Sequence, residues 1–162
     1  MRELRSIWWS RGNVVIIDQR LLPRKLEYLR IRTAIEMARA IKDMAIRGAP
    51  AIGVAAAMGL ALTAYRCRAR SREVFLERLR RSAEVLRKTR PTAVNLFWAI
   101  ERIMRVAERS ETVEEIKRNV VNEALKMAEE DVETNKRLGK IGAELIRNGD
   151  RILTHCNAGA LA

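Results

Sequence analysis

Aromatic residues, cysteine and histidine are all scarce in this sequence. Phe, Trp and Tyr make up only 4% of the 162 residues and do not alternate with the arginines, so there is no stacking platform for single-stranded nucleic acid. The two cysteines, Cys67 and Cys156, have no spacing typical of a disulfide framework or of metal ligands. We therefore expect no metal site, no disulfide and no nucleic-acid partner.

Long hydrophobic runs are also missing. No stretch approaches the roughly 18 uninterrupted apolar residues of a membrane span. The N-terminal region lacks a signal-peptide pattern, because Trp8 and Trp9 are followed at once by Ser10 and Arg11. The most apolar segment, residues 49–65, is rich in alanine and glycine, which suits a buried helix. We expect a cytoplasmic protein with no membrane partner.

Acidic residues are outnumbered by basic ones. The chain has 32 Lys and Arg against 20 Asp and Glu, a net charge of +12. Such an excess attracts nucleic acid or phosphorylated small molecules, and it also occurs on surfaces rich in ion pairs. The charge alone is weak evidence for nucleic-acid binding and leaves the other two explanations open.

The first 30 residues have the pattern of a small antiparallel sheet. Apolar residues 7–9 and 14–17 flank a turn at residues 10–13, which predicts a hairpin. Residues 26–29 alternate as a third short strand would, and Pro23 before them favours an edge position.

Helical periodicity dominates the rest of the chain. Capping boxes begin at Thr33 and Thr112, and Ser71 is a candidate N-cap between them. We expect Gly139 and Gly142 to lie on one helix face and to allow a close approach, and Gly149 to end the last helix. The predicted helices cover residues 34–46, 51–66, 72–88, 91–108 and 113–147, the last as one helix or two.

A strand is predicted after the last helix, at residues 151–155. The fold class is therefore α+β leading into α/β: a small antiparallel sheet plus a helical bundle, followed by the first strand of a truncated Rossmann-like domain. We expect three parts: an N-terminal domain at residues 1–111, a linker helix or helices at 112–149, and the start of the Rossmann-like domain at 150–162. Because a lone strand is not a plausible finished domain, we expect a fragment of a longer protein or a sequence cut short.

The sequence RGAPAIG at residues 47–53 separates two helical patterns and carries the first candidate site. Glycine permits a turn or a close approach, and proline suits the first position of a helix. A helix N-terminus beside Arg47 favours an anion such as phosphate, with the amides of Gly48, Ala49 and Ala51 as candidate donors. An ordinary helix–loop–helix joint with a solvated arginine fits the same residues.

Two further motifs complete a set with RGAPAIG: RPTAVNL at residues 90–96 and THCNAG at residues 154–159. In this order, the three resemble the methylthioribose-1-phosphate isomerases. Their superfamily includes ribose-1,5-bisphosphate isomerase and the regulatory subunits of translation initiation factor 2B. The segment DQRLLP at residues 18–23 is similar to the methylthioribose-1-phosphate branch in particular.

The resemblance implies an isomerase without a cofactor, usually a homodimer, that acts on a phosphorylated sugar in methionine salvage. It would convert 5-methylthioribose 1-phosphate to 5-methylthioribulose 1-phosphate. By carry-over, Arg47, Gly48, Ala49 and Arg90 bind substrate and Cys156 is the catalytic cysteine. The family's catalytic aspartate falls beyond Ala162, so we expect this chain to be inactive alone.

The chemistry of Cys156 depends on its surroundings. A helix N-terminus and nearby arginines would lower the pKa of a thiol, whereas an apolar pocket would raise it. Three mechanisms at this site remain open: proton relay, stabilisation of a charged intermediate, and hydride migration in a dry pocket. Adjacent strand residues point to opposite faces, so we expect His155 to pack against the fold or to support the site without touching substrate. We expect Cys67 to be structural.

Three other interpretations remain. A sister isomerase acting on ribose 1,5-bisphosphate would bind phosphate and use the cysteine in the same way. A non-catalytic subunit of the initiation-factor type would use the helical domain and the positive charge, although such a scaffold has no physical need for Arg47, Arg90 and Cys156 together. The chain would otherwise be only a folded fragment.

Overall fold

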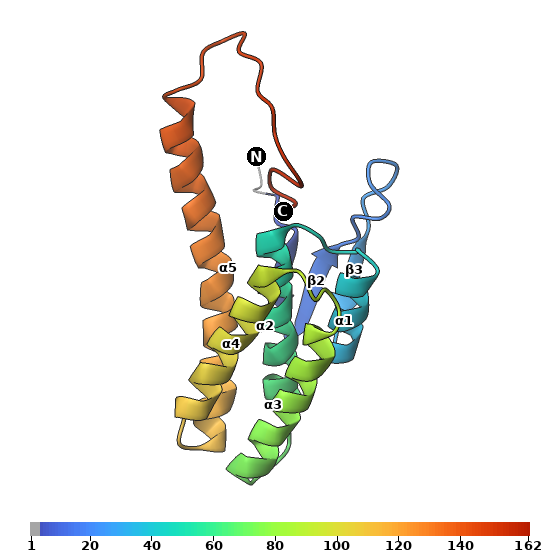
Figure 1. Ribbon diagram of the computed structural model, residues 1–162. Helices are drawn as coiled ribbons and strands as arrows, with labels where there is room; N and C mark the ends of the chain where they lie inside the picture. Colours follow the sequence, from blue (N-terminus) through green and yellow to red (C-terminus); the bar gives the residue numbers. More distant parts are fainter. Residues whose placement is uncertain (1–3) are drawn as a thin grey trace.

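The computed structural model describes residues 4–162 and places a small sheet beside a bundle of helices (Figure 1). The strands are antiparallel and lie in the order β1-β2-β3. The elements are β1 (Ile7–Ser10), β2 (Asn13–Ile17), β3 (Tyr28–Ile31), α1 (Ala34–Lys42), α2 (Ala49–Arg66), α3 (Arg72–Arg87), α4 (Val94–Arg109) and α5 (Val113–Ala143). The predicted antiparallel sheet and helical region are confirmed.

The predicted hairpin is also confirmed. Trp9 pairs with Val14 and Ser10 with Asn13, which leaves Arg11 and Gly12 as a two-residue turn. Both turn residues have positive φ, 50° and 75°, the geometry that matches the twist of a hairpin. The third strand begins at Tyr28, two residues later than the sequence pattern predicts.

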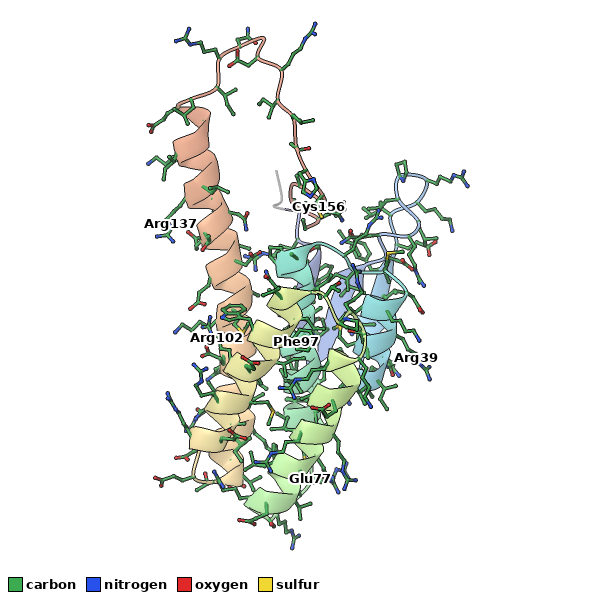
Figure 2. The ribbon with its side chains drawn as sticks, in the orientation of Figure 1. Arg39, Glu77, Phe97, Arg102, Arg137 and Cys156 are labelled. Carbon is green, nitrogen blue, oxygen red and sulfur yellow. The ribbon has the colours of Figure 1, made fainter. Side chains whose placement is uncertain are left out.

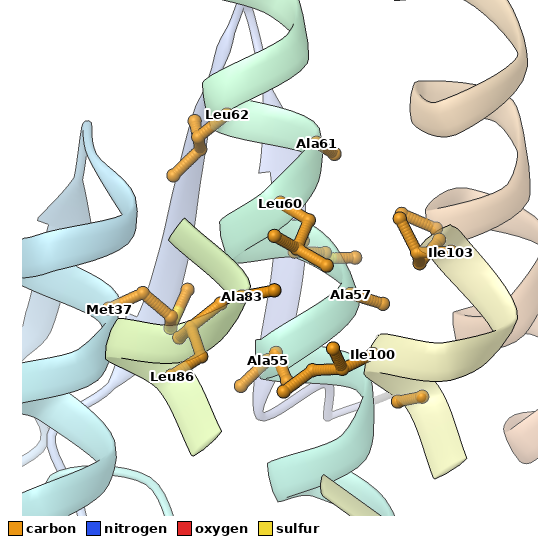
Figure 3. Packing of buried hydrophobic residues seen from close by; sticks show 14 of the residues in the cluster. Met37, Ala55, Ala57, Leu60, Ala61, Leu62, Ala83, Leu86, Ile100 and Ile103 are labelled. Atoms are coloured by element: carbon orange, nitrogen blue, oxygen red, sulfur yellow. The ribbon is translucent and has the colours of Figure 1, made fainter. Parts of the chain in front are cut away.

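Helix α2 is the centre of the bundle. Every residue from Ala51 to Leu62 is buried, and the helix packs against α1, α3, α4 and α5. Figure 3 shows side chains from α1, α3 and α4 closing around it. Gly59 permits this packing, because a Cβ there would lie 3.3 Å from both Leu86 and Met37. Although α2 is long and apolar enough to cross a membrane, 72% of that window is buried, as in the core helix of a soluble protein.

The predicted Ser and Thr caps are confirmed. Thr33, Ser71 and Thr112 each accept a hydrogen bond from the backbone three residues on. At Thr112 the reciprocal bond of a capping box is present, whereas Glu36 instead accepts from the Arg32 amide at 2.7 Å.

The prediction of a proline-started helix at Pro91 is wrong. Residues 90–93 form a turn in which the Ala93 amide donates to the Arg90 carbonyl at 3.0 Å, and α4 begins at Val94. Helix α1 also ends at Lys42, four residues before its predicted end, because Met44 adopts a positive φ of 57°.

Helix α5 is one continuous helix of 31 residues with two different halves. Its first half buries apolar residues from Val113 to Met127 against α2 and α4. Its second half exposes Leu138 and Ile141, and nothing within residues 4–162 comes within 4 Å of a Cβ at Gly139 or Gly142. No segment of residues 4–162 makes the predicted close approach at these glycines. The prediction that Gly149 ends the helix is wrong, since α5 ends at Ala143.

The predicted Rossmann-like strand is not formed. Residues 151–155 have no regular structure, and the described part of the chain places no strand beside them. A strand is stable only when a neighbour satisfies its backbone groups, which explains why the apolar pattern does not suffice here. Leu153 of this segment is 98% exposed.

Candidate functional site

The RGAPAIG motif forms the beginning of α2. Gly48 is the N-cap with φ 105°, Ala49 opens the helix and Pro50 follows in its first turn. Among residues 4–162, no acceptor bonds the amide of Gly48 or Ala49. The first amides of a helix point out of its end and carry partial positive charge, so this end of α2 suits an anion.

The two candidate phosphate arginines come from different segments. Arg47 is exposed and Arg90 is half-buried, and neither has an ion-pair partner in the part of the chain that the structure describes. Gly53 brings the two segments together, because a Cβ there would lie 3.0 Å from the Asn95 carbonyl in the first turn of α4. The beginnings of α2 and α4 therefore lie side by side, with Arg47 and Arg90 in the segments that lead into them.

The last residues of the described chain lie on the same end of α2. The Ala51 amide donates to the Ala162 carbonyl at 2.7 Å, and the Gln19 side-chain amide donates to the Leu161 carbonyl at 2.9 Å. The prediction of Ala51 as a free anion donor is therefore wrong for this arrangement. The amides of Gly48 and Ala49 have no acceptor among residues 4–162, with Ala49 exposed and Gly48 buried beneath Ala162. Sequence patterns gave no role to Gln19.

Cys156 has the position of a loop residue. Its thiol is free and exposed, and its φ is 59°. Figure 2 shows Cys156 at the end of the molecule where α2 begins. His155 is exposed, so its predicted packing role is not seen, while Cys67 is buried at the C-cap of α2 as a structural residue.

Asp18 and Arg20 form a fixed ion pair after β2. Arg20 donates to both carboxylate oxygens of the buried Asp18, at 2.8 and 2.6 Å. These hydrogen bonds hold the pKa of Asp18 below its usual value despite the opposing effect of burial. The charged pair orders the turn that carries Gln19.

A cavity of about 330 Å³ lies next to this end of α2, between α2, α4 and α5. Pro50 and Asn95 connect it to the site, and Trp98, Arg102 and Asp131 supply polar and aromatic walls. Burial raises the pKa of Asp131. The Arg102 guanidinium already has partners within the fold: it bonds Glu123 and Glu130 at 2.6 Å and lies over the Trp98 ring.

Known proteins have sequences similar to this chain. The chain is 51% identical to a putative methylthioribose-1-phosphate isomerase of Pyrococcus furiosus over 160 residues, 98% of this chain and 45% of that protein. A methylthioribose-1-phosphate isomerase of Thermosipho melanesiensis is 48% identical over 95% of this chain and 44% of its own length. The chain thus spans about half the length of the curated relatives it matches.

Two solved structures superimpose on nearly the whole chain. The 5-methylthioribose 1-phosphate isomerase from Pyrococcus horikoshii superimposes with a TM-score of 0.93 at 47% identity, covering 99% of this chain and 46% of that one. A translation initiation factor eIF-2B delta subunit from A. fulgidus gives a TM-score of 0.88 at 49% identity, covering 98% and 46%. Residues 45–162, well over half of the sequence, match the initiation factor 2 subunit family. The chain belongs to the initiation factor 2 subunit family.

Proposed function

We propose that this chain is the N-terminal half of an aldose–ketose isomerase that converts 5-methylthioribose 1-phosphate to 5-methylthioribulose 1-phosphate in methionine salvage. The observation that carries the proposal is the convergence of three segments at the beginning of α2. These are the amides of Gly48 and Ala49, which have no acceptor among residues 4–162, the Arg90 segment held by the contact of Gly53 with Asn95, and the loop after Cys156. Relatives named as methylthioribose-1-phosphate isomerases, about 50% identical, support it.

Phosphate recognition is assigned to the helix end. Gly48 and Ala49 donate backbone hydrogen bonds to the phosphate, and Arg47 and Arg90 add planar guanidinium forks that bind two oxygens at once. The partial positive charge of the helix end adds to both. No metal or cofactor takes part in this assignment.

Cys156 is assigned to the reacting carbons of the sugar. The anomeric oxygen of the substrate carries the phosphate, so the ring opens only after its own oxygen is protonated. As the bond between C1 and the ring oxygen breaks, the hydrogen on C2 moves to C1, and the C2 hydroxyl gives up its proton to become the ketone. The exposed Cys156 thiol would assist that transfer, with its acid–base partners supplied by the part of the relatives that this chain does not span.

The remaining assignments concern the whole protein. We infer a cytoplasmic homodimer without a nucleic-acid partner. Residues 1–111 would form the sheet and helical domain, residues 112–149 the linker, and residues 150–162 the start of a Rossmann-like domain. In that arrangement residues 151–155 would gain the neighbouring strands that they lack here.

A non-catalytic subunit is the second candidate, because a structure named as an eIF-2B delta subunit superimposes nearly as well. Binding of initiation factor 2 with no turnover of any sugar phosphate would favour it. Comparing the turnover of the two substrates distinguishes the proposed isomerase from a sister isomerase that acts on ribose 1,5-bisphosphate.

The decisive experiment measures ketose formation by NMR with the full-length protein. Cys156→Ser is expected to remove most turnover, while Cys67→Ala, which removes the buried thiol of α2, is the matched control and retains it. Arg47→Lys and Arg90→Lys are each expected to weaken substrate binding about tenfold or more, through loss of the bidentate contact. Unchanged turnover in Cys156→Ser refutes the role of that residue, and turnover by residues 1–162 alone refutes the expected inactivity of this half.

A further inference from the structure

Gln19 is a buried polar residue whose side chain bonds a distant segment. It is 1% exposed, and its Nε2 donates to the Leu161 carbonyl at 2.9 Å, across 142 positions of sequence. Asp18, the other buried polar residue of this turn, is occupied locally by Arg20. The Gln19 amide is therefore aimed at the segment that follows Cys156.

The backbone around Gln19 is fixed by hydrogen bonds to other parts of the chain. Its amide donates to the Ala45 carbonyl at 2.9 Å, just ahead of the RGAPAIG motif, and the Asp18 amide donates to Glu27 at 2.9 Å. Because neither bond involves residues 156–162, the backbone of Gln19 is held in place independently of them.

Backbone hydrogen bonds hold residues 159–162 against the beginning of α2. The Ala162 amide donates to the Gly159 carbonyl at 3.0 Å, and the Ala162 carbonyl accepts from Ala51. Residues 151–160 are exposed, whereas Leu161 and Ala162 are half-buried. From Cys156 to Gly159 the chain reaches at most about 11 Å, so fixing residues 159–162 limits where the thiol lies relative to Gly48.

We propose that Gln19 is a positioning residue: its buried amide holds the Leu161 carbonyl and thereby keeps the Cys156 loop over the beginning of α2. The inference rests on the proposed role of Cys156 in the isomerisation. Gln19 touches neither substrate nor thiol; it acts through the backbone of residues 159–162. Its loss should reduce the rate of the chemical step more than the binding of phosphate, which depends on Arg47 and the amides of α2.

A spectroscopic experiment tests the contact without using activity. A nitroxide label is attached to the exposed Cys156, whereas the buried Cys67 does not react with it. The mobility of the label is compared in the wild-type chain, Gln19→Met and Thr63→Val. Gln19→Met keeps the side-chain volume and removes the donor. Thr63→Val is the matched control, because it removes a half-buried hydrogen bond of 2.9 Å to Ser82, within the helical bundle.

Gln19→Met is expected to increase the mobile population of the label and to speed exchange of the Ala51 amide, each about three- to tenfold, the factor that one net hydrogen bond supplies. Thr63→Val should change neither. Unchanged mobility and exchange in Gln19→Met, with a folded chain by circular dichroism, overturns the proposed contact.

Kinetics of the full-length protein test its role. Gln19→Met is expected to lower kcat three- to tenfold with KM changed less than twofold, while Thr63→Val keeps the wild-type kcat. A released loop with unchanged kcat, or a rise in KM alone, overturns the positioning role. If wild-type protein lacks isomerase activity but the loop is still released in Gln19→Met, the proposed function fails and the Gln19 contact stands.

Discussion

Replacing Gly48 with alanine should destabilise the fold and displace the segment after Cys156. Gly48 has φ 105° and ψ 133°, a conformation that glycine adopts readily and other residues do not. A Cβ at this position would lie 2.5 Å from the Ala162 Cα and 2.7 Å from its carbonyl oxygen. Since these are backbone atoms, no side-chain rotation relieves the overlap.

The expected cost has two parts. Holding a residue other than glycine in such a backbone region costs about 1–3 kcal/mol. Displacing Ala162 also removes its hydrogen bond with Ala51, which contributes about 1 kcal/mol. The free energy of unfolding should therefore fall by about 2–4 kcal/mol, and with a urea m-value of about 2 kcal/mol/M the midpoint falls by about 1–2 M.

Urea titration followed by circular dichroism measures this change. Gly139→Ala is the matched control, because that glycine lies inside α5 and nothing in the described chain lies within 4 Å of its Cβ position. Alanine there should raise the free energy of unfolding by up to about 1 kcal/mol through helix propensity. Equal midpoints for Gly48→Ala and wild type, or the same direction of change in both variants, would refute this account of Gly48.

Three further predictions concern the bundle. Phe75→Ala removes a fully buried ring and should lower the free energy of unfolding by about 3–5 kcal/mol in the same titration. Thr112→Ala removes the cap of α5 and should cost about 1 kcal/mol, with Ser at the same position restoring most of it. The Arg102 hydrogen bonds lower the pKa of Glu130 in the folded state, so their stabilisation is present above the unfolded pKa of about 4.3 and is lost as pH falls through the lower folded pKa. Arg102→Gln should therefore differ from wild type more at pH 7 than at pH 3, as measured by urea midpoints at both.

Local signals in the sequence predicted most of the helical region. Thr33, Ser71 and Thr112 cap helices because their hydroxyls reach amides only three residues away. The hairpin around Arg11 and Gly12 is equally local. Two helix boundaries differ from the sequence prediction. A turn at residues 90–93 precedes α4, which therefore begins at Val94. Helix α5 ends at Ala143, four residues before its predicted end, in a stretch that does not pack against the bundle.

The candidate site was predicted as separate motifs, and only the fold brings them together. The Arg47 and Arg90 motifs each indicate an anion site, but their proximity depends on Gly53, whose missing side chain lets α2 approach Asn95. No periodicity or spacing in the sequence encodes that contact, because it joins positions about 40 residues apart whose residue types suit many other environments.

Gln19 illustrates the same limit more sharply. The segment DQRLLP contains Gln19 and carries the resemblance, but a glutamine after a strand is normally a solvated turn residue, and only the fold shows its burial and its bond to Leu161. Residues 151–155 show the converse, because their apolar pattern predicts a strand that no neighbour completes. Gln19 needs a distant carbonyl to accept its hydrogen bond, and residues 151–155 need a neighbouring strand. Both therefore depend on backbone groups elsewhere in the fold, which a local pattern does not specify.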